Sequence, residues 1–67
     1  MIKFIVRKQA EDLIVYLMQH KGENKWSFVN VTKGHICKCV FDSIEEAIKD
    51  MEDRKEKGLL IDYLEIP

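Results

Sequence analysis

Near the N-terminus, apolar and polar residues alternate with the period of two that is typical of a β-strand with one buried face. In the first stretch, residues 2–7, Ile2, Phe4 and Val6 alternate with Lys3, Ile5 and Arg7. Two further stretches, residues 26–32 and 35–41, are rich in aromatic and β-branched residues. They flank Lys33-Gly34, where the glycine can supply the positive φ of a tight hairpin loop. The pattern therefore predicts an N-terminal strand and a central β-hairpin.

After residue 42 the period changes to that of an amphipathic helix. Ser43 is placed to cap the helix, and Glu46 stands three residues later, as in a Ser-x-x-Glu capping box. Gly58 is suited to the C′ position that ends a helix. We predict a helix over about residues 43–57 and a final strand over residues 59–66. The apolar stripe of the helix follows i, i+3, i+4, i+7 spacing: Ile44, Ala47, Ile48 and Met51.

Residues 9–21 fit two secondary structures. Ala10, Leu13, Ile14, Leu17 and Met18 mark a helical face, and a helix here would give the ferredoxin-like order βαββαβ. Residues 13–16, however, are rich in β-formers, no N-cap residue precedes the run, and residues 21–24 make a natural hairpin loop. The strand is therefore favoured, which gives the order ββββαβ.

The favoured fold is a single α+β domain over residues 1–67, with one helix on one face of a small antiparallel sheet of order 5-1-2-3-4. Residues 13–18 are apolar on both sides, and one helix covers only one face. Since a contiguous uncovered apolar patch usually marks an interface, we expect a homodimer or a protein partner. The expected core residues are Phe4, Ile44, Ile48 and Met51. The expected contact residues are Tyr16, Met18, Trp26 and Tyr63.

Composition narrows the class of protein. The chain has 67 residues, 46% of them hydrophobic and 34% charged, which favours a globular protein over a disordered one. The longest apolar run is residues 13–18, far short of the roughly 20 residues of a membrane span. Charge interrupts residues 1–7, which also lack a small-residue cleavage site, so we expect no signal peptide and a cytoplasmic location.

One group of side chains has the chemistry of a metal site. His35, Cys37 and Cys39 alternate along one predicted strand, and thiolate with imidazole suits zinc. Structural zinc sites usually take four ligands, and the only other soft ligand is His20. We therefore interpret the cysteines as buried thiols and expect no cofactor.

Catalytic groups are not assembled by any spacing in the chain. The only serines are Ser27 and Ser43, and the second is used as a helix cap. Nothing in the sequence orients His35 as a base for a neighbouring thiol. We therefore expect that the protein is not an enzyme.

The hairpin carries the one cluster of basic and aromatic residues: Lys25, Trp26, Lys33, His35 and Lys38. A tryptophan-led hairpin followed by residues 41–47 (Phe-Asp-Ser-Ile-Glu-Glu-Ala) resembles the DNA-binding domains of plant ethylene-response factors and the arm-binding ends of tyrosine integrases. The resemblance implies a sheet laid in the major groove. Those domains carry several arginines along the strands, where this sheet has scattered lysines.

A second resemblance points to a protein partner. Phe-Asp-Ser at the start of the helix, after Asn30-Val31-x-x-Gly34, is similar to small phage-encoded inhibitors of CRISPR effector complexes, which bind protein and do not catalyse. Both resemblances rest on a strand-to-capped-helix junction that unrelated folds reuse, so neither identifies the chain.

We interpret the chain as a non-catalytic binding module that acts as a regulator or inhibitor through protein–protein interaction. Its lysine, glutamate and isoleucine bias fits a bacterial or phage source. The alternative is a nucleic-acid-binding domain that uses the 25–41 hairpin. Lysine and arginine total 11 against 12 acids, so such binding would need a local positive patch.

Overall fold

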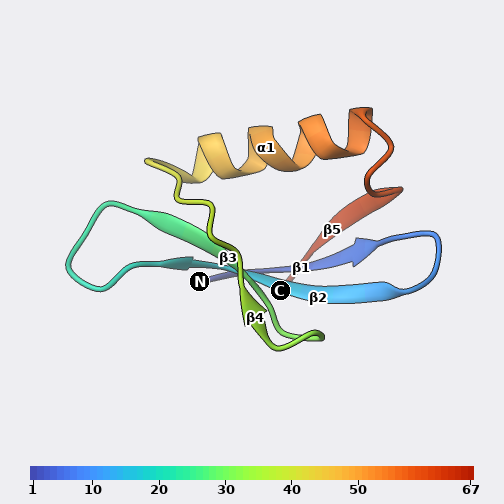
Figure 1. Cartoon of the computed structure of the whole chain (residues 1–67). Helices are drawn as coiled ribbons and strands as arrows, with labels where there is room; N and C mark the ends of the chain where they lie inside the picture. The colour runs from blue at the N-terminus through green and yellow to red at the C-terminus, as the bar shows by residue number, and fades with distance from the viewer.

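Five antiparallel strands and one helix make up the protein in the order ββββαβ (Figure 1). The computed structural model describes all residues from Met1 to Pro67. The elements are β1 (Ile2–Arg7), β2 (Asp12–Gln19), β3 (Trp26–Asn30), β4 (His35–Ile36), α1 (Ile44–Glu56) and β5 (Asp62–Ile66). The strands form one sheet in the order β4-β3-β2-β1-β5, as the sequence predicts. Residues 9–21 contain β2, so the strand interpretation of this stretch is confirmed.

The position of α1 explains why one face of the sheet is covered. The helix follows the edge strand β4 and leads to β5 at the opposite edge, so it carries the chain across the sheet (Figure 1). β5 then pairs antiparallel with β1, with Leu64 opposite Ile5. The core lies between α1 and the sheet.

The core is built from alternate residues of the strands and from the apolar stripe of the helix. Of the residues predicted to form it, Phe4 and Met51 are buried, while Ile44 and Ile48 are half-buried and pack against it. Each fully buried large side chain stabilises the fold by about 1.5–3 kcal/mol. The buried apolar residues are Phe4, Val6, Leu13, Val15, Leu17, Phe28, Ala47, Met51 and Leu60.

Local hydrogen bonds define the N-terminal end of α1. The Ser43 hydroxyl accepts a hydrogen bond from the Glu46 backbone N–H at 3.1 Å. The Glu46 carboxylate in turn accepts from the backbone N–H of Asp42 at 2.9 Å, one residue earlier than in a standard capping box. Both contacts give a partner to a backbone N–H group that has none within the helix. They therefore fix the start of the helix.

The C-terminal end of α1 has the Schellman pattern. Gly58 has a φ of 78°, and its N–H donates to the carbonyl of Lys55 at 3.1 Å. The N–H of Leu59 donates to the carbonyl of Arg54 at 2.9 Å. This pair of bonds ends the helix and turns the chain toward β5.

The second strand of the predicted hairpin is much shorter than expected. Residues 35–41 were expected to be one strand, but β4 ends at Ile36, so that expectation is wrong beyond this residue. The Cys37 N–H still bonds to the Phe28 carbonyl at 2.8 Å, and Trp26 and Phe41 form an isolated bridge. Between these two links, the three residues 38–40 lie opposite the single residue Ser27. The ladder therefore bulges, because the extra residues have no partners on β3.

Ser27 fills the bulge. Its side chain is buried, and its hydroxyl donates to the Cys39 carbonyl at 2.8 Å. The same hydroxyl lies 2.7 Å from Nε2 of His20. The buried serine therefore has two hydrogen-bond partners and holds the irregular segment against β3.

α1 is the only helix and has 13 residues, and the structure contains no helix long and apolar enough to cross a lipid bilayer.

Candidate interaction face

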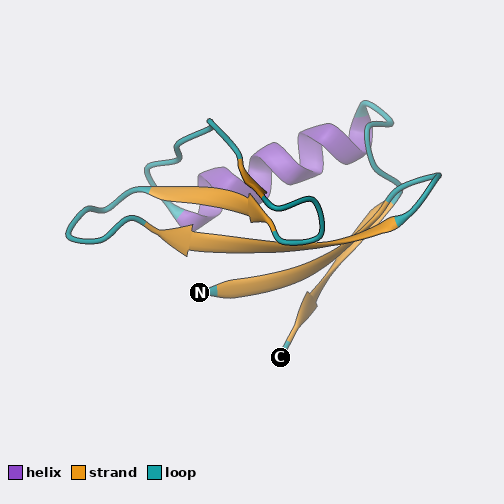
Figure 2. Cartoon of the chain, turned by 60° about the horizontal axis from the view of Figure 1, so that its bottom comes forward, coloured by secondary structure: helices purple, strands orange, loops and turns teal.

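The side of the sheet opposite α1 has no helix over it and is turned toward the viewer in Figure 2. Because side chains alternate along a strand, the residues between the core positions project to this side. Most of them are apolar. We call the following eight side chains the open face: Ile5, Ile14, Tyr16, Met18, Val29, Ile36, Leu64 and Ile66.

The strand register arranges the open face in rows that run across the sheet. In an antiparallel sheet, directly opposed residues project to the same side and lie in contact distance. A shorter row joins Ile14, Ile5 and Leu64. The longer row crosses all five strands and consists of Ile36, Val29, Tyr16, Lys3 and Ile66. Lys3 interrupts the longer row, but the shorter row lies next to it and continues the apolar surface to β5.

Several open-face side chains are well exposed. The exposed fraction is 69% for Ile36, 68% for Leu64 and 41% for Met18. Ile5 and Tyr16, in the middle of the face, are half-buried by their neighbours. Scattered exposed apolar residues are ordinary on protein surfaces, but a contiguous set on one sheet face is typical of an interaction site.

Charged groups lie at the margins of the open face, apart from Lys3. The Lys3 ammonium is 5.9 Å from the centre of the Tyr16 ring, a cation–π distance. At one end of the strands, Arg7 lies 3.9 Å from Asp12 and opposite Asp62 in the register. This arrangement, an apolar centre with a polar margin, is the usual anatomy of a protein interface.

Asp62 connects this polar margin to the helix. Its carboxylate accepts a hydrogen bond from the Tyr63 backbone N–H at 2.9 Å and pairs with the Lys55 ammonium at 3.2 Å. The backbone hydrogen bond and then the lysine keep the pKa of Asp62 below its usual value. Lys55 thus partly neutralises the charge of Asp62, which lies at the first residue of β5 and not in the centre of the open face.

Of the four contact residues expected from the sequence, the structure brings two together. Tyr16 and Met18 both belong to the open face. Trp26 and Tyr63 instead project to the helix side, where both are half-buried and pack against the core. Tyr63 meets Phe4 edge to face, with ring centres 5.9 Å apart.

Tyr63 also links β5 to the helix. Its hydroxyl donates a hydrogen bond to the Glu52 carboxylate. This bond and the partial burial of the ring raise the pKa of Tyr63 to about 12. Tyr63 therefore connects the edge strand β5 to α1.

Among the open-face residues that were not expected from the sequence, Ile36 and Leu64 are the most exposed. Their positions follow from the register, which sets Ile36 opposite Val29 and Leu64 opposite Ile5. The alternation of β1 gave a usable signal for Leu64, because the final strand was expected to pair with it. Ile36 had no such signal, because β4 is too short to show the alternation of apolar and polar residues.

The lysines of the alternative nucleic-acid surface do not form one free cluster. Lys25 pairs with Asp42, and this hydrogen bond raises the pKa of the Lys25 ammonium. Lys33 lies 2.9 Å from Glu11. Lys38 is exposed and makes no ion pair, while Trp26 contributes its ring to the helix-side packing.

The two thiols lie in the bulge, and both are free. The Cys37 sulfur accepts a hydrogen bond from the Cys39 N–H at 3.3 Å, and the Cys39 sulfur is 3.8 Å from Nη2 of Arg54. The interaction with Cys37 raises the pKa of the Cys39 thiol. Because β4 ends before Cys37, the two cysteines and His35 do not follow one another along a regular strand. No three histidine, cysteine or acidic side chains are grouped to hold a metal ion.

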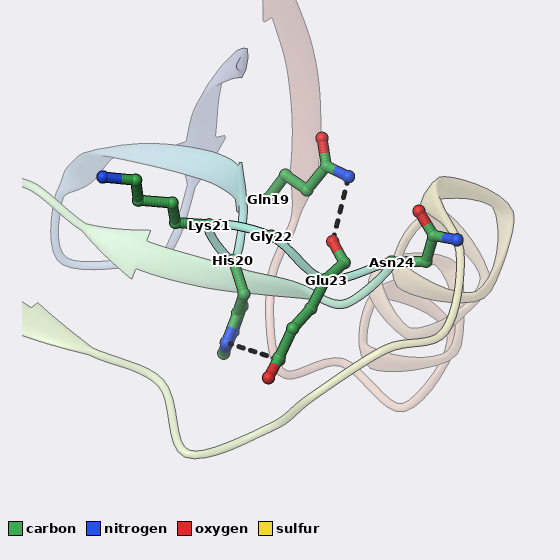
Figure 3. A pocket seen from close by; sticks show the side chains of 6 residues that line it. All are labelled: Gln19, His20, Lys21, Gly22, Glu23 and Asn24. Carbon is green, nitrogen blue, oxygen red and sulfur yellow. Dashed lines mark hydrogen bonds and ion pairs between the residues drawn. The ribbon is translucent and has the colours of Figure 1, made fainter.

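The β2–β3 loop surrounds a hollow of about 310 Å³ (Figure 3). Within it, the Gln19 amide donates to the Glu23 carbonyl at 3.0 Å, and His20 Nδ1 lies 4.0 Å from a Glu23 carboxylate oxygen. Five of the six lining residues belong to the loop, the sixth is Gln19 at the end of β2, and none is hydrophobic. Since small-molecule sites usually have an apolar lining, this hollow is a feature of the loop conformation.

Fold and surface together define a small α+β protein with a five-stranded antiparallel sheet, one face of which is apolar and open. No protein-family model matches the chain, and comparisons with curated proteins and with solved structures gave no significant match. Any functional proposal therefore rests on the chemistry of the surface.

Proposed function

We propose that the protein is a non-catalytic binding module that regulates or inhibits another protein, and that it binds through the open face. The observation that carries this proposal is the pair of neighbouring rows of opposed side chains that together cross all five strands, with Ile36 and Leu64 exposed near the two edges. Covering such a surface removes apolar area from water, which is favourable by about 25 cal/mol per Å².

The chemistry of the open face favours protein over nucleic acid as the partner. Binding to a phosphate backbone relies on lysine and arginine, which displace counterions. Only one cation, Lys3, lies in the middle of the open-face side chains, and Arg7, at their margin, lies beside Asp12. An apolar centre of this kind matches the core of a protein–protein interface.

Two occupants fit the open face, a second copy of the chain and a different protein. A second copy would pack its own open face against the first in an isologous dimer, as two sheets pack in a β-sandwich. A different protein would bring an apolar surface of its own. Both require the same residues of this chain, so one set of variants tests both.

The experiment is an affinity capture of tagged protein from host lysate at about 0.15 M salt, which is near physiological ionic strength. Captured proteins and captured nucleic acid are both assayed, and sedimentation of the purified protein measures self-association. The test variant is Leu64→Glu, and its matched control is Leu59→Glu. Both leucines are exposed, at 68% and 59%, but Leu59 follows the C-terminus of α1 and is not part of the open face. Ile36→Glu repeats the test at the opposite edge of the sheet.

We expect a stoichiometric protein partner or a dimer that is lost in Leu64→Glu and Ile36→Glu and retained in Leu59→Glu. Capture of nuclease-sensitive nucleic acid without a protein would overturn the proposal. So would a protein partner or dimer that survives both open-face variants. A monomer that captures no protein would also contradict it.

A further inference from the structure

A concave surface lies on the helix side of the sheet, which is the side opposite the open face. It is a groove of about 600 Å³ between the C-terminal half of α1 and the β3–β4 hairpin, elements that can be followed in Figure 1. This volume lies within the roughly 300–1,000 Å³ that is usual for small-molecule sites. The groove is thus large enough for a small organic molecule.

The floor of the groove is apolar and rigidly held. Its side chains come from three adjacent strands, from α1 and from the connection before β5, and all of them are also part of the core. A floor made by packed secondary structure keeps its shape without a ligand, as preformed sites do. The floor residues are Val6, Leu13, Val15, Phe28, Met51 and Leu60.

The rim of the groove is basic, and most of its charges are already neutralised. Lys33 pairs with Glu11 at 2.9 Å, and Arg54 pairs with Asp50 at 2.8 Å. Lys8 also lines the groove, and its ammonium lies within 4 Å of no carboxylate. Glu11 is the only acid among the lining residues. The rim therefore has one uncompensated positive charge beside an apolar floor.

We propose that this groove binds a small amphipathic molecule with an apolar body and a single anionic head group. The body lies on the apolar floor, and the head group lies at the rim near Lys8. A single negative charge fits because Lys33 and Arg54 already have carboxylate partners. Since the groove and the open face lie on opposite sides of the sheet, this proposal does not depend on the proposed function.

The test uses three probes that share one apolar chain and differ in charge: octanoate, octan-1-ol and octylammonium. Binding is followed by the methyl NMR signals of Leu13, Val15 and Met51 in the floor. The test variant is Lys8→Glu, and the matched control is Lys21→Glu. Both lysines are exposed, and Lys21 lies in the β2–β3 loop, outside the groove. Thermal unfolding of each variant establishes that the fold is unchanged.

We expect octanoate to shift the floor methyl signals and to bind more tightly than octan-1-ol, which in turn binds more tightly than octylammonium. Lys8→Glu should weaken octanoate about 3- to 10-fold, the range expected for reversing one partly exposed charge, and leave octan-1-ol unchanged. Lys21→Glu should leave all three affinities unchanged. Equal affinity for octanoate and octylammonium would overturn the proposal. So would shifts confined to open-face residues such as Ile36 and Leu64, or the absence of any shift up to the solubility limit of octanoate.

Discussion

At the scale of single residues, Leu17 and Leu64 distinguish the two faces of the sheet. Leu17 is fully buried under α1, whereas Leu64 is 68% exposed on the open face. We predict that Leu17→Ala lowers the free energy of unfolding by about 2–5 kcal/mol, because it leaves a cavity in the core. Leu64→Ala should change it by less than about 0.5 kcal/mol. Urea denaturation of both variants measures the difference, and similar losses would show that the helix-covered face is not the core.

The hydrogen bond between Tyr63 and Glu52 predicts a pH effect. It raises the pKa of Tyr63 in the folded protein to about 12, against about 10 in an unfolded chain. A raised folded pKa stabilises the protein fully below the unfolded value, and this stabilisation is lost as the pH rises from about 10 to about 12.

Tyr63→Phe removes this pH effect together with the hydroxyl. We therefore expect the wild-type protein to be more stable than Tyr63→Phe at neutral pH and to lose that advantage progressively above about pH 10. The measurement is the difference between their free energies of unfolding as a function of pH, in which the titration of other groups cancels. A difference that stays constant from neutral pH to about pH 12 would rule out the bond as described.

At the scale of elements, the helix cap gives the next prediction. The Ser43 hydroxyl accepts from the Glu46 N–H, so Ser43→Ala leaves that donor without its partner. We expect a loss of about 1 kcal/mol in the free energy of unfolding, within the usual range for N-cap removal. Lys49→Ala, at an exposed position in the middle of α1, is the control and should change stability by less than about 0.5 kcal/mol. Equal effects of the two substitutions on thermal unfolding would contradict the capping role.

Elements defined by local signals were predictable from the sequence. The helix was predictable, because the residues that signal its ends lie within one turn of them. These residues are Ser43, Glu46 and Gly58. β2 was also correctly favoured, because Val15 and Tyr16 prefer strands and the glycine in the loop that follows has a positive φ.

Features that depend on distant parts of the chain were not predictable. The bulge after Ile36 depends on how residues 38–40 pack against Ser27 of β3, and no local residue signals that packing. Trp26 and Tyr63 were expected at an interface because of their residue type. Which face of the sheet they occupy depends on the register, which is set by pairing across strands.

At the scale of the whole molecule, salt dependence separates the proposed protein complex from a nucleic-acid complex. A protein with six to ten phosphate contacts loses about 10³–10⁵ in affinity between about 50 and 200 mM salt. The open face has an apolar centre, so we predict that binding of its partner changes little over this range. Isothermal titration at several salt concentrations measures this, and a steep log-linear loss of affinity would favour the lysines of the hairpin as the contact surface.

The most direct test of the central claim is a methyl NMR spectrum of the labelled protein, recorded alone and with its captured partner, or at low and high concentration for a second copy. We predict that the signals of Ile5, Ile14, Ile36 and Leu64 shift or broaden on binding, because these side chains form the open face. The signals of Leu17 and Ala47, buried between the sheet and α1, should stay in place. Changes confined to α1 or to the turn between β3 and β4, with the open-face signals unmoved, would contradict the account.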